Sequence, residues 1–219
     1  MAQLFSRAAS VRLNLILLTL FVVLPVAGGA AWWGLYQSPL RTRRGIAVEQ
    51  PIPFSHKHHA GELGIDCRYC HDGVERSAFA GIPPVHTCMS CHSQVWKTAS
   101  MLEPVRAAER TGIVLPWVRV NDLPQYVAFD HSAHVNHGVG CSTCHGRIDA
   151  METVAPAVTF DMRWCLQCHG DPASYLRPRD QVMAMAWAPA ANQRVLGQRL
   201  IARYGIETKH LMDCATCHR

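Results

Sequence analysis

FDHSAHVNHGVGCSTCH, residues 129–145, is the stretch that decides the fold of this chain. It ends in Cys141-Ser-Thr-Cys144-His145, and the C-x-x-C-H pattern is typical of covalent haem attachment. Two thiols two residues apart reach the two vinyl groups on one edge of a porphyrin, and the next residue turns its imidazole onto the iron. Just upstream, Phe129-Asp-His131-Ser-Ala-His134 offers two further imidazoles. The stretch therefore predicts a c-type haem whose ligands lie close together in the chain.

The C-x-x-C-H pattern occurs five times and accounts for all ten cysteines. Zinc sites, redox-active dithiols and disulfides do not need a histidine directly after the second cysteine. We therefore expect five covalently bound haem c groups. The motifs, named first to fifth, begin at Cys67, Cys88, Cys141, Cys165 and Cys214, and their second thioether cysteines are Cys70, Cys91, Cys144, Cys168 and Cys217. The predicted proximal iron ligands are His71, His92, His145, His169 and His218.

Eight of the 13 histidines remain, which is more than five irons need on their other face. Such a surplus predicts bis-histidine, six-coordinate iron, which suits electron transfer and leaves no open position for a substrate. Phe54-Ser-His56-Lys-His58-His59 and its counterpart at 129–134 share the pattern F-x-H-x-x-H, and residues i and i+3 of a helical turn lie on one face. The predicted distal ligands are His56, His59, His131 and His134, with His210 for the fifth iron and His86, His58, His137 or Met162 as its alternatives.

The arrangement repeats along the chain. Residues 54–92 and 129–169 each carry one F-x-H-x-x-H and two haem motifs, and the fifth motif, 214–218, stands alone. From residue 51 onward there are about 34 residues per haem, too few to build a conventional apolar core beside them. We therefore predict a mostly α and irregular fold with a haem-filled core, short helices and long loops. Helices are expected within 94–110, with a break at Pro104, and within 176–204.

An uncharged apolar stretch, residues 13–36, precedes this region. It would span roughly 36 Å as a helix, enough to cross a bilayer, and Trp32, Trp33 and Tyr36 would lie at the headgroups. A cleaved secretory signal is the alternative, but the stretch is longer than a usual signal core. We expect a cytoplasmic tail at 1–12, a transmembrane anchor helix at 13–36 and a periplasmic haem domain at 37–219, because haem is attached to C-x-x-C-H outside the cytoplasmic membrane. The predicted location is the inner membrane, crossed once.

The formal charge of +5 belongs to the polypeptide alone. A ferric haem with two ionised propionates and neutral axial ligands carries about −1, so that five haems bring the oxidised protein close to neutral. The basic residues are scattered rather than gathered into a groove. We therefore exclude nucleic acid as a partner.

Three segments are similar to a known family. FSHKHHAGELGIDCRYCH (54–71), AGIPPVHTCMSCHSQVW (80–96) and PWVRVNDLPQYVAFDHSAHVNHGVGCSTCHG (116–146) resemble the pentahaem cytochrome c subunit of bacterial alternative complex III. The resemblance implies an electron-transfer subunit of a membrane quinol:electron-acceptor oxidoreductase, with no substrate-converting site of its own. Its implied partners are an iron–sulfur subunit, polytopic membrane subunits, a monohaem cytochrome c and membrane lipid.

A second resemblance, to small multihaem cytochromes of the c3 and c7 type, implies that the two histidines of F-x-H-x-x-H bind the irons of two different haems. The first histidine would serve the nearest following haem and the second a neighbouring haem.

Two other functions compete with the relay. A stand-alone quinol dehydrogenase of the NapC/NrfH type would have four haems and no F-x-H-x-x-H repeat. A catalytic multihaem reductase would need an open high-spin haem, often with lysine as proximal ligand, whereas all five motifs here end in histidine.

Overall fold

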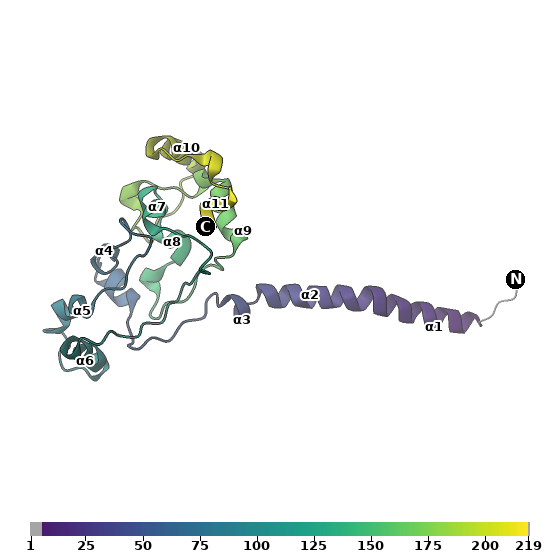
Figure 1. Ribbon diagram of the computed structural model, residues 1–219, viewed down its shortest axis with the longest axis horizontal. Helices are drawn as coiled ribbons and strands as arrows, with labels where there is room; N and C mark the ends of the chain where they lie inside the picture. The colour runs from purple at the N-terminus through teal and green to yellow at the C-terminus, as the bar shows by residue number, and fades with distance from the viewer. Residues whose placement is uncertain (1–5, 219) are drawn as a thin grey trace. The chain divides into compact units, whose positions relative to one another are not determined.

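The computed structural model describes residues 6–218, which fall into two compact units that meet between Arg44 and Gly45. Each unit is described by itself. The N-terminal unit consists of α1 (Arg7–Leu18), a π-helical turn η1 (Thr19–Val23), α2 (Leu24–Gln37) and α3 (Pro39–Thr42) (Figure 1).

The first three elements form one continuous helix, Arg7–Gln37, with a mean hydropathy of 2.2 over its most apolar window. Within residues 6–218 it is the one helix long and apolar enough to cross a membrane, although a signal sequence near an N-terminus meets the same criterion. It begins at Arg7, inside the predicted tail 1–12, and residues 1–5 of that tail lie outside the described part. The wider π-helical turn comes directly before Pro25, whose ring and missing N–H disturb regular α-helical bonding to the preceding turn.

The second unit consists of short helices joined by long loops. Its α-helices are α4 (Cys67–Cys70), α5 (Val85–His92), α6 (Glu103–Thr111), α7 (His131–Asn136), α8 (Cys141–His145), α9 (Met162–Gly170), α10 (Gln193–Tyr204) and α11 (Cys214–Cys217). Its single turns are η2 (Lys57–Glu62), η3 (Ser100–Leu102), η4 (Ile148–Ala150), η5 (Pro172–Ser174), η6 (Arg179–Gln181) and η7 (Thr208–His210). The described residues contain no β-strand beyond an isolated bridge between Val139 and Leu176, so the helical fold class is confirmed.

Two expected helices are shorter than the sequence indicated. The segment 94–110 becomes α-helical only at Glu103, because Pro104 fits the first turn of an α-helix and not its interior. Glu103 then pairs with Arg106 and Arg110, and Gly112 ends α6 with a φ of 72°. In 176–204 a single α-helix forms, α10.

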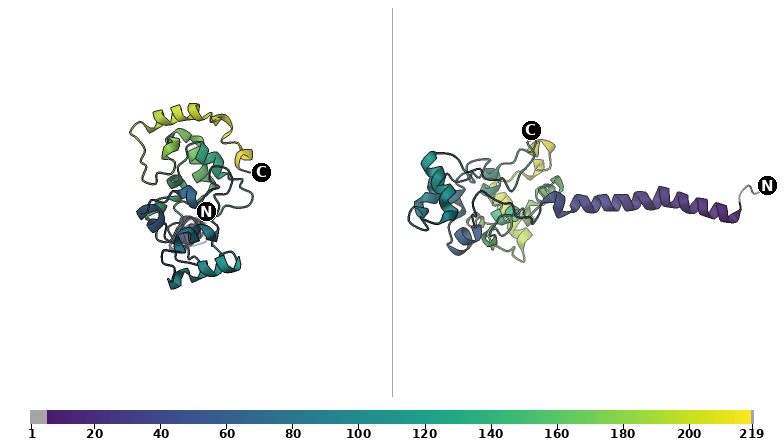
Figure 2. Two further views of the ribbon diagram at one scale, coloured as in Figure 1. Left: turned by 90° about the vertical axis from the view of Figure 1, so that its left-hand side faces the viewer. Right: turned by 90° about the horizontal axis from the view of Figure 1, so that it is seen from below.

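The apolar core is small and divided. Ile52, Val105, Ala108 and Leu115 form one buried cluster around α6, and Ala173, Leu176, Val182 and Leu200 are buried near α10. Helix α10 packs on η5 because Gly197 has no side chain: a Cβ there would lie 1.9 Å from the Ala173 carbonyl oxygen. In Figure 1 and in the left view of Figure 2, α6 and α10 lie at opposite ends of this unit, and the haem motifs lie between them.

Candidate functional site

Every C-x-x-C-H motif lies on a helical turn. The first, third and fifth form α4, α8 and α11, and the second and fourth lie within α5 and α9. A helical turn brings residues i and i+3 to one face, so each pair of thiols points the same way. Asp66 and Asp161 cap two of these turns by accepting from the backbone N–H groups of Arg68 and Trp164.

The thiols themselves do not resemble a redox-active pair. Burial raises the pKa of Cys141 to about 11 and that of Cys144 to about 12, whereas redox-active dithiols have lowered thiol pKa values. All ten cysteines are free of disulfides. Across residues 6–218 no cluster of three or more His, Cys, Asp or Glu side chains has metal-binding geometry, which does not favour a zinc site.

Four predicted distal histidines each face one predicted proximal histidine. The ring centres of His56 and His71 are 6.4 Å apart, as are those of His131 and His145. His59 faces His92 and His134 faces His169, both with ring centres 6.1 Å apart. Metal–imidazole bonds are about 2 Å long, so two imidazoles on opposite sides of one metal have ring centres on the order of 6 Å apart. The side chains therefore fit a metal held between each pair.

The pairs fall into two geometries. The rings are nearly parallel in His56–His71 (4°) and His131–His145 (5°) but inclined in His59–His92 (64°) and His134–His169 (43°). The phenylalanine of each F-x-H-x-x-H explains why each repeat has one parallel and one inclined histidine pair. Phe129 stacks on His134 and meets His131 edge-on, and the earlier repeat does the same.

Three of the imidazoles that form these pairs have lowered pKa values, which favours the neutral form that metal ligation requires. Burial, and then the neighbouring His71, lower the pKa of His56 to about 4. Burial, and then His131, lower the pKa of His145 to about 4 as well. Burial also lowers the pKa of His134.

Most of the eight paired histidines, and also His218, direct Nδ1 at a backbone carbonyl oxygen, which leaves Nε2 to point at a metal. Seven do so: His59 to Ser55, His71 to Gly81, His92 to Val95, His131 to Ala78, His134 to Asp130, His169 to Leu211 and His218 to Tyr126. The shared pattern fixes one tautomer at all seven rings, with the proton on Nδ1.

His56 and His145 are the exceptions. The Nδ1 atom of His56 is buried without a hydrogen-bond partner. The Nδ1 atom of His145 lies 3.0 Å from Nδ2 of Asn121, while Oδ1 of Asn121 is buried without a partner. Turning the amide over, so that Oδ1 accepts from Nδ1–H, satisfies both groups, and amide oxygen and nitrogen are interchangeable in shape.

The fifth site differs from the others. His210 donates to Asp213 through Nδ1–H, and no ring contact joins it to His218 within residues 6–218. The other candidates also have local roles: His58 binds Glu62 and stacks on Trp96, His137 binds the Ala133 carbonyl, and His86 and Met162 are exposed. His218 directs Nδ1 at the Tyr126 carbonyl oxygen, and its ring stacks on that of Tyr126.

Arg177 is a functional candidate that sequence reasoning missed. It is only 3% exposed, and its guanidinium donates to the side chains of Ser142 and Thr143, the two middle residues of the third motif. It also donates to the Ala184 carbonyl and stacks on Trp187, and no carboxylate pairs with it in the described part of the chain. Burial without an acidic partner lowers its pKa, yet an arginine stays charged at neutral pH. The sequence did not indicate this contact, because Arg177 lies far from the third motif along the chain.

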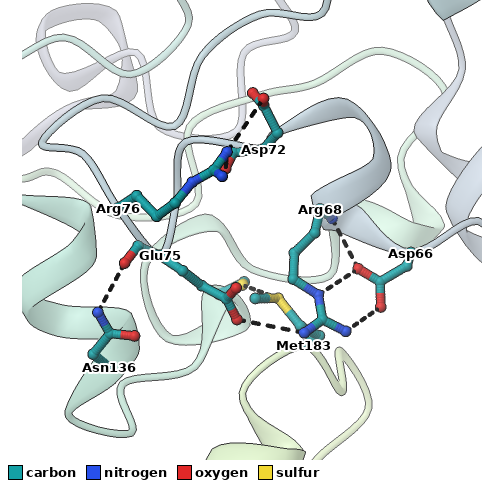
Figure 3. A network of polar contacts seen from close by, with 8 residues as sticks. Asp66, Arg68, Asp72, Glu75, Arg76, Asn136 and Met183 are labelled. Carbon is teal, nitrogen blue, oxygen red and sulfur yellow. Dashed lines mark hydrogen bonds and ion pairs between the residues drawn. The ribbon is translucent and has the colours of Figure 1, made fainter.

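A polar network ties the first haem motif to α7 (Figure 3). Arg68 bonds to Asp66 and Glu75, and Asn136 donates to the backbone oxygen of Glu75. Arg76 pairs with Asp72 at 3.5 Å. The ion pairs are exposed, so they position the loop more than they stabilise it.

Comparison with known proteins agrees with this geometry. Residues 127–219 match the family described as cytochrome c7 and related cytochrome c, whose members bind haem c covalently. The chain is also 38% identical over 128 residues to the menaquinone reductase multihaem cytochrome c subunit of Nitratidesulfovibrio vulgaris. That alignment covers 57% of this chain and 57% of the relative. Residues 127–219 of this chain are therefore similar to cytochrome c7 and related cytochrome c, and the chain is similar over part of its length to the multihaem cytochrome c subunit of a menaquinone reductase.

Proposed function

We propose that this chain is a pentahaem electron relay of a membrane quinone-linked oxidoreductase. The observation that carries the proposal is the four histidine pairs, each with a separation suited to one iron. Bound haem supplies one-electron iron chemistry. The chain's own paired thiols would attach it and the paired imidazoles would ligate its iron, most of them held by a hydrogen bond at Nδ1. Two filled axial positions leave no room for a substrate at these four sites.

The first histidine of each repeat serves the first haem of its module and the second histidine serves the second. His56 and His71 thus hold the first haem, His59 and His92 the second, His131 and His145 the third, and His134 and His169 the fourth. For the remaining, fifth haem we keep His210 as distal ligand opposite His218; its Nδ1 donates to Asp213, which leaves Nε2 available for a metal.

The proposed setting is the periplasmic face of the inner membrane, with Arg7–Gln37 as a retained anchor. The sequence resemblance supports a place in alternative complex III, passing electrons from quinol towards a periplasmic cytochrome. The named relative supports a second direction, towards menaquinone reduction. Both use the same relay and differ in the partners at its two ends.

Spin state tests the ligand assignment. Replacing His131 or His134 by alanine should convert one low-spin ferric haem of five to high spin in each variant, seen by electron paramagnetic resonance. His137→Ala is the matched control on the same segment and should leave all haems low-spin. His210→Ala should create one high-spin haem. An unchanged spectrum for His210→Ala removes that residue as ligand without affecting the other four.

The assembly is tested on solubilised membranes. A large haem-staining band on a native gel, containing an iron–sulfur subunit and several polytopic subunits, supports the complex. A small band with this chain alone would instead favour a stand-alone quinol dehydrogenase. A haem content below five per chain contradicts the relay as proposed.

A further inference from the structure

The order of the haem motifs in space differs from their order in sequence. The first and second motifs lie side by side, because Tyr69 and Ser90, one middle residue from each, are joined by a 2.8 Å hydrogen bond.

The third motif lies next to the first. The loop that follows the first motif binds the start of α7: the Ala78 carbonyl oxygen accepts from His131 Nδ1 at 2.8 Å, and that of Ser77 accepts from the Ser132 N–H at 3.1 Å. The network in Figure 3 lies at this junction.

The fourth motif lies next to the third, because α7 presents His131 to the third motif and His134 to the fourth from a single helical turn. The fifth motif lies next to the fourth: His169 Nδ1 is 2.8 Å from the Leu211 carbonyl oxygen, and Met212 lies against Gly170.

Exposure agrees with this succession. Among the ten cysteines, Cys91 and Cys214 are the exposed ones, and they belong to the second and fifth motifs. In Figure 1, α5 lies at one side of the unit and α9 and α11 at the other, with α4 and α8 between them. Large apolar side chains are exposed beside both ends: Val95 and Trp96 after the second motif, and Tyr126 and Met212 beside the fifth.

We propose that the five haems form one unbranched line in the order second, first, third, fourth, fifth, and that electrons enter and leave at its two ends. The inference rests on the proposed function, since it assumes that all five motifs carry haem. The second haem and the fifth haem are then the two docking points for redox partners. The first, third and fourth haems exchange electrons only with their neighbours in the chain.

The test uses the full-length haem-loaded protein with a ruthenium photosensitiser on one introduced cysteine. Lys97→Cys places the label beside the second motif and Lys209→Cys places it beside the fifth; both lysines are exposed. The ten native thiols are consumed as thioethers, so only the new one reacts. The measurement is the number of haems reduced in the fast phase after a series of flashes. A labelled protein that keeps all five haems should give five from either label.

Two haem-deletion variants discriminate between the orders. Without the second haem (Cys88→Ala with Cys91→Ala), the label at 209 should still reach all four remaining haems, whereas a line in sequence order would strand the first and give three. Without the first haem (Cys67→Ala with Cys70→Ala), the label at 97 should reach one haem and the label at 209 three. Four haems reached from position 97 in that variant would overturn the order.

The failure of this inference is distinguishable from failure of the relay itself. Haem content, measured as the pyridine complex, should be five in the parent and four in each deletion variant. Five haems with the wrong fast-phase counts contradict the order alone. Fewer than five in the parent contradict the proposed function, whatever the flash experiment gives.

Discussion

At the scale of single residues, some contacts to the paired histidines come from within the motifs and others from distant parts of the chain. The C-x-x-C-H and F-x-H-x-x-H patterns are local, so the sequence was enough to choose the histidines that the structure brings together. Asn121 contacts His145, which is 24 residues away in the sequence, and Arg177 contacts Thr143, which is 34 residues away. No sequence pattern marks either residue. For the last distal ligand the sequence has no comparable pattern: His210 was ranked first among several candidates although it lies close to its own motif, and in the structure it bonds to Asp213.

Asn121 should adjust the reduction potential of the third haem through His145. An acceptor at Nδ1–H makes the imidazole a stronger donor to iron and stabilises the ferric state. Asn121→Leu should therefore raise one of the five potentials, and Asn121→Asp should lower it, each by about 1 kcal/mol in free energy. Redox titration followed in the visible spectrum measures both. Asn192→Asp, at an exposed position, is the control, and shifts of the same sign in both Asn121 variants would contradict this role.

Arg177 should raise the potential of the third haem, because a fixed positive charge disfavours the more positive ferric site. Arg177→Gln should lower one potential by on the order of 1 kcal/mol, and Arg177→Lys should largely restore it. Arg179→Gln is the matched control, since Arg179 is exposed and stacks on Tyr204. If lysine and glutamine shift the potential equally, the side chain acts only by holding Ser142 and Thr143.

At the scale of secondary-structure elements, the two F-x-H-x-x-H segments show how much the sequence determines. It predicted that both would present histidines from one turn, and they do so although one is a π-helical turn and the other an α-helix. Helix boundaries were less predictable, as α6 shows: composition favoured a start at Gln94, but Pro104 sets the start at Glu103. The packing of α10 depends on contact between Gly197 and Ala173, which only the folded chain reveals.

Ring orientation within the pairs predicts two spectroscopic classes. Each axial imidazole interacts with the iron d orbitals along one direction, so parallel rings split these orbitals strongly and inclined rings split them weakly. The first and third haems should give ordinary rhombic ferric signals in electron paramagnetic resonance, and the second and fourth should give signals with a large maximal g value.

The phenylalanine of each F-x-H-x-x-H segment offers a matched test of these two spectroscopic classes. Phe129→Leu should release His134 and alter one large-g signal, whereas Phe54→Leu should alter the other through His59. Both variants should keep five haems. Four identical signals in the parent protein would contradict the assigned ring geometry.

At the scale of the whole molecule, the sequence predicted the division into an apolar helix and a haem-binding part, because hydropathy and cysteine content change abruptly between them. The small apolar core also follows from composition, since five cofactors leave little chain to pack. The spatial order of the motifs did not follow, because it depends on how the loop at Ser77–Ala78 meets α7.

The helix Arg7–Gln37 should keep the mature protein in the membrane. The haem protein should stay in the pellet after a carbonate wash, and replacing residues 1–37 by a cleavable signal should release a soluble form with five haems. Sequencing the mature N-terminus is the complementary measurement. A mature chain that begins beyond residue 37 would show that the helix is a signal and not an anchor.

The backbone acceptors of seven iron-facing histidines have a consequence for how such a relay changes over generations. A carbonyl oxygen is present whatever the side chain, so substitutions at Ser55, Ala78 or Leu211 leave the acceptor itself in place. Inherited variation can therefore reshape the surface and the loops while most of the iron environments stay constant. The third haem, where a side-chain amide does the same task, is the site at which a single nucleotide change can retune the relay for a new donor or acceptor.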